Sequence, residues 1–228
     1  MPLTVEASPS PPLLQRRIAL ITGGEGGLAK ALRLHLEAEG WEVHAPGKAV
    51  LDVTCGTSVT AAFAELDRLD LIINNAGVIE DDLMLKMTET QWDHVMKVNL
   101  DGAFRCTRAA LKLMVKQRAG HIINIGSMSA LNGPAGQAAY AAAKAGLIGL
   151  TRSTALEYGG RNVRCNCVLP GFLETKMTRA VLAKDRAGVL ERHALGRLNT
   201  PEEAARFIVM LDSFEHVSGQ VFRVDSRV

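Results

Sequence analysis

The chain has 228 residues, 47% hydrophobic and 4% aromatic, with a formal net charge of +2 at pH 7. The length suits one large α/β domain with a sizeable core, and no apolar run is long enough to span a bilayer. The small charge and the few aromatic residues argue against a nucleic-acid-binding protein, which would need a strongly basic surface or a series of stacking rings.

The chain opens with a proline-rich stretch, residues 1–15, which we expect to form a flexible arm ahead of a single domain over residues 16–228. This stretch does not have the basic start and apolar middle of a signal peptide, so we expect a cytoplasmic protein with reduced cysteines. Beyond the arm, short apolar runs alternate with helical patterns. The predicted strands cover residues 16–22, 41–45, 69–77, 121–126, 162–170 and 219–225.

Helix-starting residues lie between these strands. Ser58 is predicted to cap a helix, Thr88 or Thr90 to start a long helix that Gly120 stops, and Thr200 to cap a helix with Pro201 at its first position. The predicted helices cover residues 28–40, 58–68, 88–118 and 137–160, and two more follow residue 170. Alternating strands and helices with apolar strands predict a doubly wound (Rossmann-type) parallel sheet with helices on both faces.

One connection is too short for this pattern. Only Pro46-Gly47-Lys48 separates the second predicted strand from the apolar piece at residues 49–52, whereas a parallel crossover needs a dozen or more residues. Either residues 49–52 are not a strand beside the second one, or the crossover helix has been lost. We therefore predict six parallel strands and a sheet edge that is shortened near residues 46–52.

A glycine-rich turn, Thr22 to Ala29, follows the first strand and opens the first helix. Glycines allow a ligand to approach the backbone, and a helix N-terminus favours an anion, so this turn suits a dinucleotide pyrophosphate. Its spacing is G-x-x-x-G, with Gly23 and Gly27, and not G-x-G-x-x-G. A second turn, Asn74-Asn75-Ala76-Gly77, ends the third strand, where asparagine side chains can tie neighbouring loops together.

Tyr140 and Lys144 lie four residues apart in an Ala- and Gly-rich helix, with Ser127 thirteen residues before the tyrosine. Positions i and i+4 share one helix face, so the ammonium is expected to lower the pKa of the phenol, which can then exchange a proton with a carbonyl oxygen. Ser127 can hydrogen-bond the same oxygen. Asn99 is a polar residue within the apolar segment VMKVNLDGAF; it is either a structural residue that bends a helix or part of the same site.

Together, these motifs resemble those of the short-chain dehydrogenase/reductase family over residues 16–225, and most closely the β-ketoacyl-acyl-carrier-protein reductases. The resemblance implies hydride transfer from NAD(P)H to a ketone, with fatty acid biosynthesis as the setting. It implies that Tyr140 protonates the oxygen, Ser127 orients it, Lys144 binds the nicotinamide ribose, and Asn99 holds a water in a proton relay. The residues expected at the cofactor, from the resemblance together with the position of each residue in this sequence, are Thr22, Gly23, Glu25, Gly26, Gly27, Leu28, Lys48, Asp52, Val53, Asn75, Ala76, Gly77, Tyr140, Lys144, Pro170, Gly171, Leu173 and Thr175.

The chain departs from the family pattern on the cofactor side. Ala29 replaces a glycine, Glu25 brings a negative charge into the phosphate turn, and the adenine side is shortened. No Asp ends the second strand to bind the ribose 2′-hydroxyl, whereas Lys48 can meet a 2′-phosphate. We therefore expect NADP(H) to be favoured over NAD(H).

The resemblance also implies a homotetramer that pairs through the two long helices and the last strand. A stripe of basic residues on the first long helix consists of Arg105, Arg108, Lys112 and Lys116. This stripe is either a solvated face or, with Arg118 and Arg161, a docking surface for an acidic acyl-carrier protein. We expect no metal site, because the six histidines are scattered without a His–carboxylate cluster.

Two alternative functions remain open: a reductase of another ketone, such as a sugar or polyol, and a cofactor-binding regulatory protein without turnover.

Overall fold

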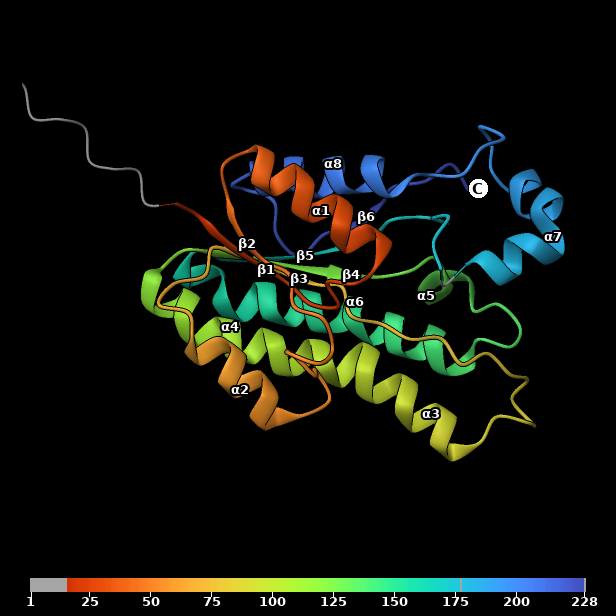
Figure 1. The fold of residues 1–228 in the computed structure, drawn as a ribbon, viewed down its shortest axis with the longest axis horizontal. Helices are drawn as coiled ribbons and strands as arrows, with labels where there is room; N and C mark the ends of the chain where they lie inside the picture. The colour runs from red at the N-terminus through yellow and green to blue at the C-terminus, as the bar shows by residue number, and fades with distance from the viewer. Residues whose placement is uncertain (1–15, 177, 228) are drawn as a thin grey trace, which may run out of the picture.

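The computed structural model describes residues 16–176 and 178–227, so the predicted arm at residues 1–15 lies outside the described residues. Within this part of the chain, six parallel strands form one sheet in the order β2-β1-β3-β4-β5-β6, between two layers of helices (Figure 1). This confirms the predicted fold class and the predicted number of strands. The strands are β1 (Ile18–Ile21), β2 (Glu42–His44), β3 (Leu71–Asn74), β4 (Gly120–Ile125), β5 (Val163–Leu169) and β6 (Val221–Arg223).

The two faces of the sheet are covered by different helices (Figure 1). On α1, Leu28, Leu32 and Leu36 recur every fourth residue, and all three are buried in a core shared with α8. A second core lies on the opposite face, where α2 and α4 pack against the sheet. The helices of the first layer are α1 (Gly27–Ala38) and α8 (Pro201–Asp212), and those of the second are α2 (Gly56–Ala64), α4 (Gly102–Gln117) and α6 (Ala138–Tyr158).

The sheet edge is shortened as predicted. β2 is an edge strand that pairs with β1, and the chain then turns, with the amides of Val50 and Leu51 donating to the Gly47 carbonyl at 3.1 and 3.0 Å. Residues 49–52 therefore form no strand beside β2. Leu51 is buried in the α2-side core, so the chain crosses directly from the edge of the sheet to its other face.

Two of the predicted helix starts are confirmed, and one is wrong. Thr88 forms a capping box with Gln91 at the start of α3 (Glu89–Met96), and Thr200 caps α8 with Pro201 in the first turn. Ser58, in contrast, lies inside α2, which begins at Gly56 and ends at Ala64. The Ser58 hydroxyl accepts from the Asp52 amide at 3.0 Å, so it holds the preceding loop and does not cap the helix.

The long helix predicted for residues 88–118 is interrupted. Between α3 and α4, residues Lys97–Asp101 form a π-helical turn. The Asn99 side chain donates to the Val95 carbonyl at 2.9 Å, and a side chain that enters the backbone ladder in this way opens a helix. The helix then ends at Gln117, before Gly120, because Arg118 takes a left-handed conformation with φ 52°.

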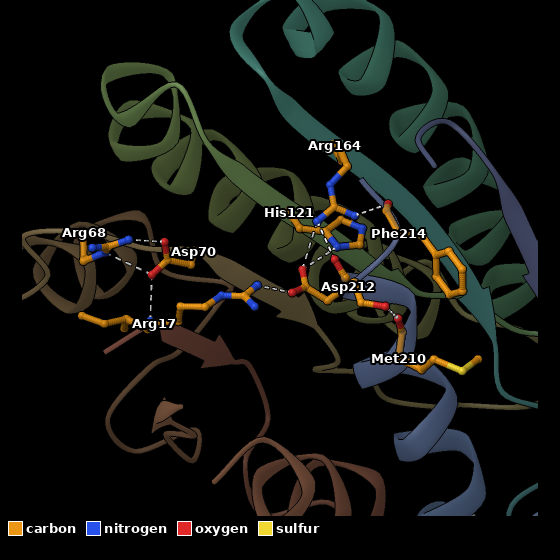
Figure 2. A network of polar contacts seen from close by, with 10 residues as sticks. Arg17, Arg68, Asp70, His121, Arg164, Met210, Asp212 and Phe214 are labelled. Carbon is orange, nitrogen blue, oxygen red and sulfur yellow. Dashed lines mark hydrogen bonds and ion pairs between the residues drawn. The ribbon is translucent and has the colours of Figure 1, made fainter. Parts of the chain in front are cut away.

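A buried polar cluster, which sequence reasoning missed, joins β4 and β5 to the end of α8 (Figure 2). The Asp212 carboxylate accepts from His121 Nδ1 at 3.0 Å, from Arg164 at 3.2 Å and from Arg17. Asn166 donates to His121 Nε2 at 3.0 Å, which leaves the ring proton on Nδ1 and the histidine neutral. The spacing of residues in the chain gave no sign of this pairing between a histidine and a carboxylate. Among the described residues, no three His, Cys, Asp or Glu side chains gather as a metal site.

Candidate active site

The first and third strands end side by side, and their turns are tied together as predicted. The Thr22 hydroxyl accepts from the amides of Asn75 and Ala76 at 3.0 and 2.9 Å, and the Asn75 side chain donates to the Thr22 carbonyl at 3.0 Å. These contacts join the glycine-rich turn to residues 74–77 at the carboxyl edge of the sheet, which is where parallel α/β sheets bind ligands.

The glycine-rich turn has the features of a pyrophosphate site. Gly23 has φ +68°, and a Cβ there would lie 2.9 Å from the Ala76 Cα, so this position requires glycine. No side chain among the described residues caps α1, and its first turn holds no acidic residue, so its amide groups are open to an anion. A Cβ at Gly27 would lie 3.4 Å from the Thr175 methyl, which places the loop after β5 across the turn.

At the shortened edge of the sheet, the structure brings Lys48 near Asp52. Hydrogen bonds from Thr54 and, less strongly, the charge of Lys48 lower the pKa of the Asp52 carboxyl. The Glu25 carboxylate lies against the shortened edge, since a Cβ at Gly47 would stand 2.6 Å from its Oε1. Ala29 stands where the family pattern has glycine. Its methyl group is fully buried in the core beside α1, so the structure accommodates it.

Lys144 is buried beneath the carboxyl ends of the strands. Its ammonium donates to the Ile125 carbonyl at 2.7 Å and stands 5.6 Å from the centre of the Tyr140 ring. Burial lowers the pKa of Lys144 to about 8. The two residues thus share one side of α6, as their spacing predicts.

The acidity of Tyr140 differs from the sequence expectation. Burial raises the pKa of the phenol, a hydrogen bond with Ser127 lowers it, and the charge of Asp81 raises it further, so that the net shift is upward. The expected lowering by Lys144 is therefore wrong for this structure, because the ammonium is directed to a backbone carbonyl and desolvation of the phenolate dominates.

Asn99 and Lys144 meet on either side of Gly77. A Cβ on this glycine would lie 2.8 Å from Asn99 Oδ1 and 3.7 Å from Lys144 Nζ. Asn99 also donates to the Val78 carbonyl at 2.9 Å and accepts from its amide at 3.3 Å. The asparagine thus fixes the strand-end turn beside the lysine, and only a residue without a side chain fits between them.

The loop after β5 closes one side of the site. Gly171 has φ +85°, and the Thr178 hydroxyl donates to the Leu173 carbonyl at 2.5 Å. Asn199, which the sequence did not single out, donates to the Pro170 carbonyl at 2.8 Å. Sequence reasoning also missed a group of polar residues around Ser127, which no spacing pattern marks because they come from separate segments. These residues are Asp81, Ser129 and Gln137.

Comparison with known proteins agrees with this geometry. A sequence profile described as enoyl-(acyl carrier protein) reductase matches residues 26–226. The chain is 39% identical to the 3-oxoacyl-[acyl-carrier-protein] reductase FabG of Thermotoga maritima, with 93% of this chain and 97% of that protein covered. The chain belongs to the short-chain dehydrogenase/reductase family. The FabG proteins of Salmonella typhimurium and Aquifex aeolicus are 37% and 36% identical to it, over 92% and 93% of this chain and 96% and 97% of theirs.

As a short-chain dehydrogenase/reductase, the chain is an NAD(P)-dependent oxidoreductase. The residues present fit such a cofactor, because the glycine-rich turn leaves room for a pyrophosphate and the open start of α1 offers it amide donors. Within residues 16–176 and 178–227, no helix combines the length and apolarity that a membrane span needs.

Proposed function

We propose that this protein reduces the ketone of a 3-oxoacyl thioester, carried by an acyl-carrier protein or coenzyme A, to the 3-hydroxyacyl form. The observation that supports this most strongly is the meeting of Tyr140, Lys144 and Ser127 at the carboxyl ends of the strands, in a chain that resembles FabG proteins over nearly its whole length. Asn99 joins them across Gly77.

In this mechanism the bound dinucleotide supplies the hydride, and the protein supplies the proton and the positioning. Tyr140 donates its proton to the ketone oxygen, and Ser127 donates a hydrogen bond to the same oxygen. The buried Lys144 ammonium holds the nicotinamide ribose beside Tyr140. Asn99, at the opened turn of its helix, holds a water that returns a proton to the site.

We infer that the cofactor is bound by the residues that line the strand ends. The glycine-rich turn takes the pyrophosphate, Asp52 and Val53 contact the adenine, Asn75 contacts the adjoining ribose, and the loop after β5 closes on the nicotinamide. NADP(H) is favoured modestly over NAD(H), because Lys48 attracts the 2′-phosphate whereas Glu25 opposes it. The residues of the turn are Thr22, Gly23, Glu25, Gly26, Gly27 and Leu28, with Ala76 and Gly77 opposite them, and those of the closing loop are Pro170, Gly171, Leu173 and Thr175.

The proposed partner for the thioester is an acidic acyl-carrier protein that docks beside Arg118 and Arg161. Both arginines are exposed, and Arg118 donates to the Gly160 carbonyl at 3.4 Å, so the two cations share one surface. We also propose a cytoplasmic homotetramer that pairs through the long helices, where Phe104 on α4 and Leu156 on α6 are 45% and 87% exposed.

A substrate panel tests the proposal. NADPH and NADH consumption is measured with a 3-oxoacyl-acyl-carrier protein, acetoacetyl-coenzyme A, and small sugar and polyol ketones. We expect the thioesters to be reduced most efficiently. Faster turnover of a small ketone would assign the protein to another substrate, and tight cofactor binding without turnover of any ketone would favour a regulatory protein.

A further inference from the structure

The half-buried side chain of Asn199 joins the loop after β5 to the segment after β6. Its amide group donates to the Pro170 carbonyl at 2.8 Å and to the Val224 carbonyl at 2.6 Å. Its side-chain oxygen accepts from the Thr200 amide at 2.8 Å. The residues that we infer for the cofactor do not include Asn199, so these contacts have no assigned role.

The three partners of this side chain determine its orientation. Two of them are carbonyl oxygens, which only accept, and the third is a backbone amide, which only donates. The NH₂ group of Asn199 must therefore face the two carbonyls, and its oxygen must face Thr200. Loss of the NH₂ group would release Pro170 and Val224 at once.

The oxygen side of Asn199 is attached to a helix that packs beside the glycine-rich turn. Thr200 is the N-cap of α8, and its hydroxyl accepts from the Glu203 amide at 3.0 Å. α8 shares one core with α1 and lies beside it (Figure 1), and α1 is the helix that follows the glycine-rich turn. Asn199 is therefore held in a fixed relation to the turn that we infer for the pyrophosphate.

The donor side of Asn199 holds the beginning of the loop after β5, residues 170–176, which we call the closing loop. Leu173 in this loop forms a parallel β-bridge with Asn199. Gly171 has φ +85°, and a Cβ there would lie 2.5 Å from the Asp225 Cβ, so the loop packs directly on the segment after β6. The beginning of the loop thus lies between Asn199 and that segment.

The other end of the closing loop lies against the glycine-rich turn. A Cβ at Gly27 would lie 3.4 Å from the Thr175 methyl, and the Thr175 amide donates to the Thr178 hydroxyl at 3.0 Å. The loop is therefore held at both ends across the carboxyl edge of the sheet. A loop that is ordered in advance loses less conformational entropy when a ligand binds to it.

We propose that Asn199 is a positioning residue that holds the closing loop in its cofactor-binding conformation before the cofactor binds. The inference rests on the proposed function for the placement of the nicotinamide at this loop. Without the two donated hydrogen bonds, the nicotinamide half of the dinucleotide should bind more weakly. The adenosine half, which we infer at Asp52 and Val53, should keep its affinity.

Asn199→Asp tests this directly, because it keeps an oxygen for the Thr200 amide and removes both donors. Calorimetry measures Kd for NADPH and for 2′-phospho-ADP-ribose, which lacks only the nicotinamide. We expect NADPH to bind roughly threefold to tenfold more weakly, the effect of about one hydrogen bond, and the Kd of the fragment to change by less than about twofold. Asn199→Ala, which brings in no charge, should show the same selective loss.

Amide hydrogen exchange reports on the loop itself in the absence of any ligand. In both Asn199 variants, exchange at residues 170–176 should be faster than in the wild type. Exchange in the glycine-rich turn, Thr22 to Ala29, should be unchanged, because none of its residues bonds Asn199 in the described structure.

Two matched variants serve as controls. Asn162→Asp makes the same change just before β5, where the side-chain amide donates to the Arg118 carbonyl at 3.0 Å. Thr200→Ala removes the cap of α8 and leaves both donors of Asn199 in place, so it should lower Tm. Neither control should change the ratio of the two Kd values, whereas an effect of lost stability alone would appear in Thr200→Ala as well.

An unchanged NADPH Kd in the Asn199 variants, or an equal loss for NADPH and the fragment, would overturn the inference. Faster exchange in the loop without a selective loss would overturn it too, because the loop would then not hold the nicotinamide. Neither measurement needs a substrate. If the selective loss is found although no 3-oxoacyl thioester is reduced, the proposed function fails and the inference stands.

Discussion

Replacing Asp212 by Asn should destabilise the protein strongly, because this carboxylate serves three donors at once (Figure 2). Its side chain is 3% exposed, and those of His121, Arg164 and Arg17 are 0%, 16% and 50% exposed. Breaking a fully buried pair by removing one partner costs about 3–5 kcal/mol, and the half-exposed Arg17 is screened by water, so we expect a loss of about 3 kcal/mol.

The assay is equilibrium unfolding in urea, supported by thermal melting. For a chain of this size, about 3 kcal/mol corresponds to a fall of roughly 6–12 °C in Tm. Glu37→Gln is the matched control, because it removes the charge from an exposed ion pair with Arg33 at 2.7 Å on α1. This control should cost no more than about 0.5 kcal/mol of unfolding free energy. An Asp212→Asn protein as stable as the Glu37→Gln control would refute the reasoning.

The same cluster predicts a pH dependence of stability. Burial lowers the pKa of His121. Burial by itself would raise the pKa of Asp212, but the hydrogen bond from His121 and the charge of Arg17 outweigh it, so the pKa of Asp212 is lowered as well. In both cases the unfolded chain binds a proton that the folded chain does not. Stability at this cluster should therefore fall below about pH 6.5 for His121 and below about pH 4 for Asp212.

Three further predictions concern the site and the assembly. Gly77→Ala should weaken cofactor binding and turnover at least tenfold, because its Cβ would stand 2.8 Å from Asn99 Oδ1, and unchanged Kd and kcat would contradict that placement. The wild type should prefer NADPH by roughly tenfold in kcat/KM, a preference that Lys48→Ala removes and Glu25→Ser increases; equal effects of Lys48→Ala on both cofactors would make Lys48 a solvated loop residue. Sedimentation at micromolar concentration should show a tetramer, and a monomer would rule out pairing through α4 and α6.

Much of the fold could be predicted from local patterns. Most of the strands coincide with short apolar runs, and the lost crossover follows from the three residues between position 45 and position 49. The helix starts at Thr88 and Thr200 were readable because capping depends on residues within one turn. Tyr140 and Lys144 were found because helical spacing alone places them on one side of α6.

What the sequence did not reveal depends on contacts between distant segments. Asp212 and His121 are ninety-one positions apart, and neither residue signals its partner. Ser127, Gln137 and Asp81 meet only after three loops have packed together. The upward shift of the Tyr140 pKa is of the same kind, because burial is a property of the folded molecule and the Tyr–Lys spacing shows only the opposing charge.

The central claim is that Tyr140 gives the proton in an NAD(P)H-dependent reduction of a 3-oxoacyl thioester. The most direct measurement compares NADPH consumption by the wild type and by Tyr140→Phe on that substrate, together with the cofactor Kd from fluorescence titration. We predict a loss of about 10²–10⁴-fold in kcat with a nearly unchanged Kd, because the phenol oxygen supplies the proton and little cofactor affinity. A variant that keeps more than about a tenth of the wild-type rate would contradict the assignment.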